Sequence, residues 1–156
     1  MKPIVCAPNN VLTSESQSVT VFDKRLEALI GEMKTTLLKT RNPKGVGLAA
    51  PQIGLSLRIF ITRPKEESKI RVFINPEIIN RSEDETDVVP ERENKLEGCL
   101  SIPKIWGKVK RAKTLSLRYQ DEKGNIHKEK FSGFIATIIQ HETDHINLIL
   151  FTQRVL

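Results

Sequence analysis

The 156-residue sequence has little cysteine, few aromatic residues and no long apolar run. Two cysteines, Cys6 and Cys99, are too few for the disulfide framework of a small secreted protein, so we expect a reduced, intracellular protein with a thiol free to act. Aromatic residues make up 5% of the chain, which argues against the aromatic-studded strands of RNA-binding modules. The longest apolar cluster is interrupted by Asn147, Thr152 and Gln153 and is too short to cross a membrane.

The N-terminus also lacks the features of a targeting peptide. Residues 1–8 have neither the apolar core of a signal peptide nor the Arg/Ser-rich character of a transit peptide. We therefore expect a cytoplasmic protein, or an organellar one if a transit peptide has been removed. With 38% hydrophobic and 28% charged residues, residues 1–156 are expected to form a single globular domain.

The net charge of +6 is unevenly distributed along the chain. Acidic residues concentrate between positions 83 and 97, and basic residues between 104 and 113. A basic face can hold a protein near RNA or another anionic surface. A merely soluble surface explains the same charges at least as well, so both interpretations stay open.

The apolar periodicity predicts one helix near each end of the chain and strands between them. Asp23 is suited to cap a helix that runs to about Thr40, and Ser132 with Gly133 should start the second helix. Residues 82–95 are expected to form an exposed polar loop. The expected strands are 57–62, 70–75, 77–80, 109–112, 114–119 and 126–131, the last two forming a hairpin. This layout predicts an α+β fold with mostly antiparallel sheets.

Residues 45–54 contain three glycines and a proline, which argues strongly against a regular helix. The small side chains suggest that another chain or a ligand approaches this backbone closely. A phosphate-binding loop is a poor alternative, because neither Gly-x-Gly-x-x-Gly nor a following Lys-Ser/Thr is found. Spacing alone predicts a tight turn between strands.

Residues 140–145 contain a His-Glu-x-x-His motif on the second predicted helix. His141 and His145 are four residues apart, so both imidazoles can reach one metal ion from the same helix face. Glu142 stands where zinc hydrolases of this type keep the base that deprotonates water. An ordinary amphipathic helix is the alternative, and it is weakened because two of the three histidines lie in this motif. The sheets should therefore pack around a C-terminal metal-binding helix.

A catalytic metal site needs a third protein ligand. The candidates are Cys6, Cys99, His127 and the carboxylates. His127 falls beside lysines in a hairpin arm, and Cys6 falls in the loose N-terminal segment. The Cys99 thiolate would complete a Cys/His/His set with a fourth position open to water. Spacing alone favours Cys99 as a ligand only modestly over a buried structural cysteine.

Three stretches together make the sequence resemble the peptide deformylase family. They are Gly-x-Gly-Leu-Ala-Ala-x-Gln at 45–52, Glu-Gly-Cys-Leu-Ser at 97–101 and Gln-His-Glu-x-Asp-His at 140–145. The similarity extends over about residues 4–151. The three motifs together are specific, whereas His-Glu-x-x-His alone does not separate this family from metalloproteases.

The resemblance implies a metal-dependent hydrolase that removes the formyl group from the N-terminal methionine of new polypeptides and releases formate. It implies the metal ligands Cys99, His141 and His145, with Fe2+ as the expected metal and Zn2+, Ni2+ or Co2+ as substitutes. It also implies Glu142 as the general acid/base. Gln52 and the backbone N–H of Leu100 are the implied oxyanion donors.

The resemblance further implies how substrate lies on the protein. An extended peptide would pair with the backbone around Val46, Gly47 and Leu48. The formyl-methionine side chain would enter a pocket lined by Val46, Phe134, Thr137 and Ile138. The implied partners are N-formylmethionyl peptides and nascent chains, with weak ribosome association, no membrane contact and a monomeric state.

Some positions depart from the family pattern. Leu148 stands where many relatives have glycine, Thr137 replaces a more usual apolar residue or arginine, and Trp106 follows the cysteine motif where it can flank the peptide cleft. Residues 82–95 form a longer segment than expected. Only eleven residues follow His145, which leaves no room for the ribosome-docking helix of many bacterial members.

Two other functions compete with deformylation. A small metallopeptidase is disfavoured, because none of the residues after His145 is His, Glu or Asp and could act as its third ligand. A degenerate family member kept as a metal-stabilised binding module is the alternative from another class. The intact chemical positions argue against it, and the departures at Leu148 and Thr137 keep it open.

Overall fold

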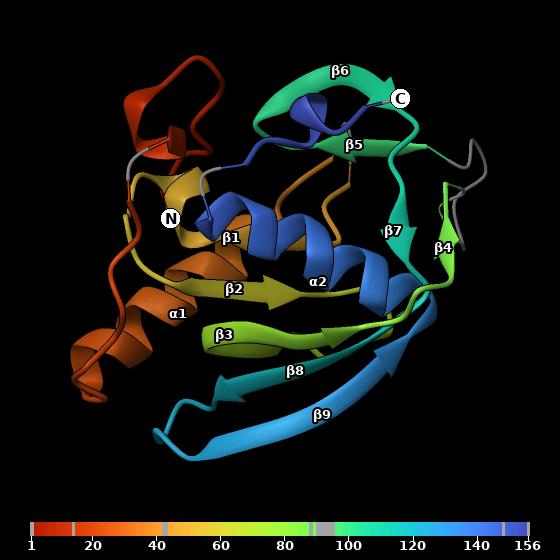
Figure 1. Cartoon of the computed structure of the whole chain (residues 1–156). Helices are drawn as coiled ribbons and strands as arrows, with labels where there is room; N and C mark the ends of the chain where they lie inside the picture. Colours follow the sequence, from red (N-terminus) through yellow and green to blue (C-terminus); the bar gives the residue numbers. More distant parts are fainter. Residues whose placement is uncertain are drawn as a thin grey trace.

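A five-stranded antiparallel sheet forms the centre of the fold (Figure 1). The computed structural model describes residues 2–13, 15–41, 44–87, 89, 96–147 and 149–155. The strand order is β1-β2-β3-β8-β9, which places β1 at one edge of the sheet. The strands are β1 (Gly47–Ala49), β2 (Ile59–Thr62), β3 (Arg71–Arg81), β8 (Thr114–Gln120) and β9 (Ile126–Ser132).

Two small antiparallel sheets and two α-helices complete the described structure. One small sheet pairs β4 (Glu85–Thr86) with β7 (Arg111–Ala112), and the other pairs β5 (Glu97–Cys99) with β6 (Ile102–Gly107). The helices are α1 (Lys24–Leu38) and α2 (Gly133–Ile146), and the short 3-10 helices are η1 (Asn10–Thr13), η2 (Ala50–Ile53) and η3 (Phe151–Gln153). The predicted α+β fold with mostly antiparallel sheets around the C-terminal helix is confirmed.

Local side-chain chemistry sets the ends of the two α-helices. The Asp23 carboxylate accepts hydrogen bonds from the backbone N–H groups of Arg25 and Leu26, so it caps α1 as predicted. Gly133 has a φ of 71°, a conformation that suits glycine and allows the turn from β9 into α2. At the other end of α2, the Arg58 guanidinium donates to the Ile146 carbonyl, where a positive charge also complements the helix dipole.

The central sheet separates two apolar clusters, one under each α-helix. Along β2, Ile59 and Ile61 join the cluster that contains α1, whereas Phe60 joins the cluster that contains α2. Phe73 is fully buried in the second cluster, with ring centroids 5.0 Å from Phe60 and 4.8 Å from Tyr119. Helix α2 therefore lies across one face of the sheet, where it contacts all five strands, β1, β2, β3, β8 and β9 (Figure 1).

Two of the strand predictions are corrected by the structure. Residues 70–75 and 77–80 belong to one strand, β3, because the bend at Asn75-Pro76 shifts the register without ending the pairing. The Asn75 side chain bonds the N–H and carbonyl of Val19, so a side chain replaces part of the strand ladder there. Residues 45–54 are more than a tight turn, since they contain edge strand β1 and helix η2.

The hairpin β5–β6 was not expected from the sequence. Its strands contain Gly98 and Pro103, which lower strand propensity, and the register shifts between Gly98 and Cys99. The expected loop at 82–95 is interrupted by strand β4, while positions 88 and 90–95 lie outside the described residues. Leu148 also lies outside them, so its effect on the end of α2 stays a prediction.

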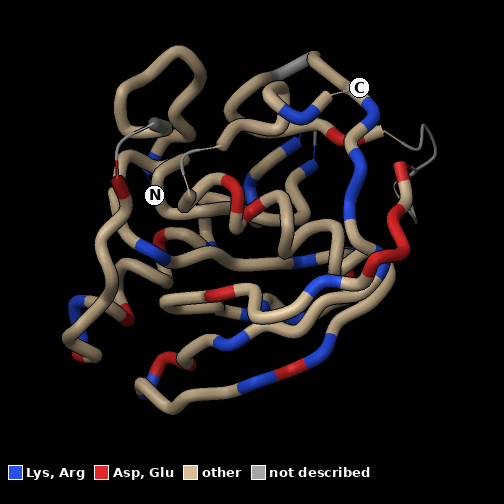
Figure 2. Tube along the Cα trace, in the orientation of Figure 1, with Lys and Arg blue, Asp and Glu red and all other residues tan. Residues whose placement is uncertain are grey.

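The acidic and basic segments of the sequence lie side by side. Strand β4 from the acidic segment pairs with β7 from the basic segment, and the Lys113 N–H donates to the Asp84 carbonyl. Figure 2 shows the acidic stretch running along the basic one. Arg111 of the basic segment is buried in ion pairs with Glu97 and Asp144, so its charge is used internally, which weakens the interpretation of a free basic face. In the part of the chain that the structure describes, neither α-helix is long and apolar enough to cross a bilayer.

Replacing Phe73 with alanine should destabilise the protein strongly. The change removes a ring that is 0% exposed, so we expect the free energy of unfolding to fall by about 3–5 kcal/mol, measured by urea denaturation. Ile79→Ala on the same strand is the control, because Ile79 is 46% exposed and its loss should cost less than about 0.5 kcal/mol. Equal losses in the two variants would contradict the assignment of the core.

Candidate metal centre and adjoining pocket

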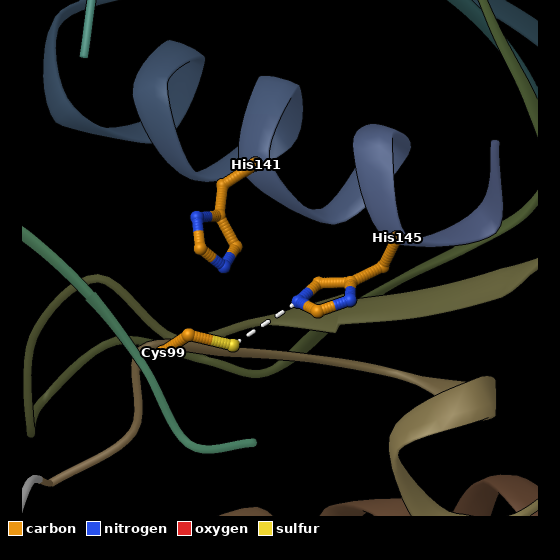
Figure 3. Close-up of side chains that lie close together, drawn as sticks. All are labelled: Cys99, His141 and His145. Atoms are coloured by element: carbon orange, nitrogen blue, oxygen red, sulfur yellow. Dashed lines mark hydrogen bonds between the residues drawn. The ribbon is translucent and has the colours of Figure 1, made fainter. Parts of the chain in front are cut away.

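Cys99, His141 and His145 meet in the interior of the protein (Figure 3). Cys99 ends strand β5, and the two histidines project from α2 toward it. The Cys99 Sγ and His145 Nε2 atoms are 3.2 Å apart, and one ligand atom from each residue lies within 4.8 Å of the others. The hairpin β5–β6 and the helical spacing of the two histidines together bring these three side chains to one point.

This set of atoms fits a divalent metal ion. Ligand atoms around one tetrahedral ion lie roughly 3.3–3.8 Å apart, so a single ion can contact all three side chains after small movements. Burial lowers the pKa of His141, but hydrogen bonds to Cys99 and Glu97 outweigh burial and raise it to about 10. Burial lowers the pKa of His145 well below its ordinary value, which favours the neutral form that binds metal. Positive charge is therefore favoured at His141 and disfavoured at His145.

Glu97 orients the His141 ring by a hydrogen bond to its Nδ1 atom. The Nδ1 atom of His141 is 2.9 Å from Glu97 Oε1, and both carboxylate oxygens of Glu97 accept hydrogen bonds from Arg111 at 2.8 and 2.9 Å. Burial would raise the pKa of Glu97, but the bonds from Arg111 and His141 hold it at about 2. Ionised Glu97 therefore accepts the Nδ1–H of His141, so Nε2 is the atom that would give up its proton when a metal binds.

Glu142 lies between the histidines and the glycine-rich strand. Burial raises the pKa of its carboxyl to about 7, although the charge of His141 opposes the rise. Its Oε2 atom is buried and has no hydrogen-bond partner among the described residues. A Cβ atom at Gly47 would come within 2.9 Å of Ile138 and 3.1 Å of Glu142, so glycine is what allows β1 to approach α2 here.

The Gln52 amide faces the same point with a fixed orientation. Its Oε1 atom accepts the backbone N–H of Ala49 at 2.9 Å, so its Nε2 atom points the other way. This Nε2 donates to Ser101 Oγ at 3.2 Å and to Cys99 Sγ at 3.6 Å. Leu100 follows Cys99 and lines the adjoining pocket. The structure therefore gathers Gln52, Leu100 and Glu142 around the three candidate ligands.

A mostly apolar pocket opens beside the metal group. The predicted substrate residues Val46, Gly47, Phe134, Thr137 and Ile138 line its walls, with Gln52, Cys99, His141 and Glu142 also on its surface. Leu48 is different, because its side chain is fully buried in the cluster under α1. Only the backbone of Leu48, in edge strand β1, can take part in binding.

Several residues of the site were not predicted to belong to it. Val89 is buried against Phe134 and Ile138, but it comes from a polar segment that gave no sign of a pocket residue. Glu97 belongs to the motif at 97–101 and Asp144 to the motif at 140–145, and both are buried. Arg111, outside the motifs, is buried as well. Arg111 lies in a basic run, so its burial was hidden by the exposed lysines around it.

Trp106, expected to flank the peptide cleft, lines the pocket. It lies on β6 and its ring covers Gly98, where an added Cβ atom would come within 2.7 Å of the ring. The other candidate third ligands lie elsewhere. Cys6 is exposed, and His127 is exposed beside Asp121, with His127 Nε2 and Asp121 Oδ2 2.8 Å apart.

Comparisons with known proteins agree on one family. Its sequence profile, described as Polypeptide deformylase, matches residues 1–156. The peptide deformylase of Pseudothermotoga lettingae is 41% identical over 151 residues, which cover 97% of this chain and 81% of that protein. Peptide deformylase 1 of Bacillus subtilis is 36% identical over 155 residues, which cover 99% of this chain and 90% of that protein.

A solved structure gives the same result. The crystal structure of the peptide deformylase from Thermotoga maritima superposes with a TM-score of 0.89 at 33% identity, covering 100% of this chain and 98% of that chain. A deformylase structure from Plasmodium falciparum has a TM-score of 0.89 at 35% identity, covering 98% of this chain and 86% of that chain.

Removing a candidate ligand should abolish tight metal binding. We expect Cys99→Ala or His145→Ala to weaken Co2+ binding by more than the roughly 10- to 100-fold that loss of an outer hydrogen-bond partner costs. The metal-to-protein ratio after dialysis, measured by plasma mass spectrometry, checks this. His127→Ala removes the remaining histidine, which is exposed, and should leave the ratio unchanged. A loss of metal in that variant instead would contradict the ligand set.

Proposed function

Because the chain belongs to the polypeptide deformylase family of metallo-hydrolases, we propose that it hydrolyses the N-formyl group of N-terminal formylmethionine and releases formate. One observation carries the proposal. The Cys/His/His group, the Glu142 carboxylate and the Gln52 amide all adjoin one mostly apolar pocket. Five of the predicted substrate residues line the same pocket. Metal, proton acceptor, amide donor and side-chain pocket are thus within reach of one bound peptide end.

The chain's site residues support a divalent metal held by Cys99, His141 and His145. When bound, such an ion lowers the pKa of a coordinated water and polarises a carbonyl group. We propose Fe2+ as the native ion, with Zn2+, Ni2+ or Co2+ as substitutes. Glu97 keeps the His141 ring in the orientation and tautomer that metal binding requires.

Glu142 is proposed to move the proton. Its carboxylate takes a proton from the attacking water and later gives it to the amine of the leaving peptide. Two observations support this role, since Glu142 Oε2 has no partner among the described residues and Glu142 Oε1 lies 3.8 Å from His141 Nε2. A buried carboxylate beside the ligands, with one oxygen free, is placed to exchange a proton at the reacting centre.

Gln52 and the Leu100 backbone N–H are proposed to meet the negative charge that develops on the formyl oxygen. The Ala49 N–H holds the Gln52 carbonyl, so the amide cannot turn its oxygen toward that charge without losing a hydrogen bond. A fixed donor of this kind typically contributes about 3 kcal/mol to transition-state stabilisation. Leu100 directly follows the proposed ligand Cys99 in the sequence, so its backbone N–H lies beside the proposed metal site.

The peptide is proposed to bind as an added strand along β1, with its methionine side chain in the pocket. Edge position gives β1 backbone groups that can pair with an incoming chain, whatever its side chains. The walls formed by Val46, Phe134 and Ile138 suit an unbranched apolar side chain, and Thr137 adds a hydroxyl to them. The partners would be formylmethionyl peptides and nascent chains.

We further propose that residues 1–156 act as a single monomeric domain. It would work in the compartment where formylated chains are made, either the cytoplasm or an organelle. Ribosome association would be weak. Sedimentation velocity with and without ribosomes measures both the oligomeric state and this association.

Replacing Glu142 with glutamine should abolish activity but keep the metal. We expect kcat for formate release from formyl-Met-Ala-Ser, measured without oxygen on iron-loaded protein, to fall on the order of 100- to 10,000-fold. The reason is that an amide cannot accept the proton. Glu77→Gln, at an exposed position of β3, is the matched control and should keep full activity.

The same assay separates the other functions. Full activity of the Glu142→Gln variant would contradict the role of this carboxylate. Internal cleavage of unformylated peptides by the wild-type protein would favour a metallopeptidase. Tight binding of formyl-Met-Ala-Ser by the iron-loaded wild-type protein without formate release would favour a binding module.

A further inference from the structure

The C-terminal segment returns to the metal-bearing helix through one arginine. Arg154 follows η3 and donates two hydrogen bonds to the Asp144 carboxylate, from Nε to Oδ2 at 2.6 Å and from Nη2 to Oδ1 at 3.1 Å. The Asp144 side chain is only 5% exposed, whereas that of Arg154 is 41% exposed. A side chain that reaches solvent is therefore bonded to a buried charge on α2.

From Asp144, charge-assisted hydrogen bonds continue to a metal ligand. Asp144 Oδ2 also accepts a bond from Arg111 Nη1 at 2.6 Å. Arg111 holds both carboxylate oxygens of Glu97, and Glu97 accepts the Nδ1–H of His141. The path Arg154–Asp144–Arg111–Glu97–His141 thus joins the protein surface to the candidate metal centre.

The balance of charge gives Arg154 a specific task. Arg111 is buried between two buried carboxylates, and His141 faces Glu97, so without Arg154 the Asp144 carboxylate would share the charge of Arg111 with Glu97 and stay partly uncompensated. An uncompensated charge in a dry interior is costly, and it would draw the Arg111 guanidinium toward Asp144. The bonds between Arg111 and Glu97 would then weaken, and with them the orientation of the His141 ring.

We propose that Arg154 is a positioning residue for the metal centre. By neutralising Asp144 it lets Arg111 hold Glu97, and Glu97 in turn fixes the His141 ring for metal binding. The inference rests on the proposed metal site and on no step of the hydrolysis. It makes the C-terminal segment part of the site. Phe151 and Leu150 of this segment also pack in the cluster that contains Cys99, and the Phe151 ring centroid is 5.8 Å from that of His141.

The C-terminal segment has other contacts that should keep it in place when Arg154 is changed. Phe151 is 1% exposed and packs in the cluster that contains Cys99. Val155 forms an antiparallel bridge with Val109. A variant at position 154 is therefore expected to fold, which allows its effect on the metal to be measured.

The test compares Arg154→Ala, Arg154→Lys and the control Arg118→Ala. Arg118 is an exposed arginine of β8 that lies away from the metal group. Two readouts need no substrate: the dissociation constant for Co2+ and the visible absorption spectrum of the Co2+-loaded protein. Loss of an outer hydrogen-bond partner costs roughly 10- to 100-fold in metal affinity, so we expect Arg154→Ala to weaken Co2+ binding about tenfold and to shift the spectrum.

Arg154→Lys keeps the charge and should recover most of the affinity, while Arg118→Ala should match the wild type. A double-mutant cycle adds a sharper criterion. In an Asp144→Asn background there is no charge for Arg154 to balance, so Arg154→Ala should then change the Co2+ affinity by less than about twofold. In the formate-release assay, Arg154→Ala should lower kcat and leave KM unchanged.

Unchanged Co2+ affinity and spectrum in Arg154→Ala, with only a lower melting temperature, would overturn the proposal. Arg154 would then stabilise the fold without affecting the metal site. Equal effects of Arg154→Ala in the wild-type and Asp144→Asn backgrounds would also overturn it. If Arg154→Ala fails to fold, Arg154→Gln takes its place: without the charge it should also weaken Co2+ binding about tenfold, and an unchanged affinity would overturn the proposal. Because the metal readouts use no peptide, a wild-type protein that releases no formate would refute the proposed function and leave this inference standing.

Discussion

The buried ion pair between Arg111 and Glu97 is the interaction on which the rest of the site depends. It places two full charges in the interior, where only mutual contact and further hydrogen bonds keep them stable. Glu97 belongs to β5 and Arg111 to β7. Each also bonds a residue of α2, Glu97 bonding His141 and Arg111 bonding Asp144, so the pair joins three elements. Breaking it would leave a charge unpaired beside the metal ligands.

The interior of α2 explains why such a pair is needed. From Gln140 to His145 every side chain is buried, although the residues are polar or ionisable. Gln140 satisfies its amide by bonding both backbone groups of Ala112, His141 bonds Glu97, and Asp144 bonds Arg111 and Arg154. Apolar residues of α2 hold the helix against the sheet. Its polar residues are equally buried, and they include the candidate metal ligands and Glu142.

Much of the fold and of the candidate site follows from the sequence. Both α-helices are where apolar spacing and Asp23 place them, because these signals lie within a few residues of each other in the chain. The three motifs come together as the family resemblance implies. Hairpin β5–β6 escaped prediction because Gly98 and Pro103 lower strand propensity and the register shifts beside Cys99, so the local pattern did not indicate strands. Val89 and Arg111 escaped for another reason, since burial of a single residue in a polar stretch depends on what packs over it.

Gly47 shows how one missing side chain affects both the fold and the site. It lets edge strand β1 lie against Ile138 and Glu142 of α2, so the edge proposed to bind the peptide lies directly beside the helix that holds the two histidines. An open strand edge is also a template for unwanted pairing with other chains. Here β1 is three residues long, a length that offers few hydrogen bonds to a second protein. The same shortness limits how many main-chain hydrogen bonds β1 could give the proposed peptide, so most of the peptide's binding energy would have to come from the pocket.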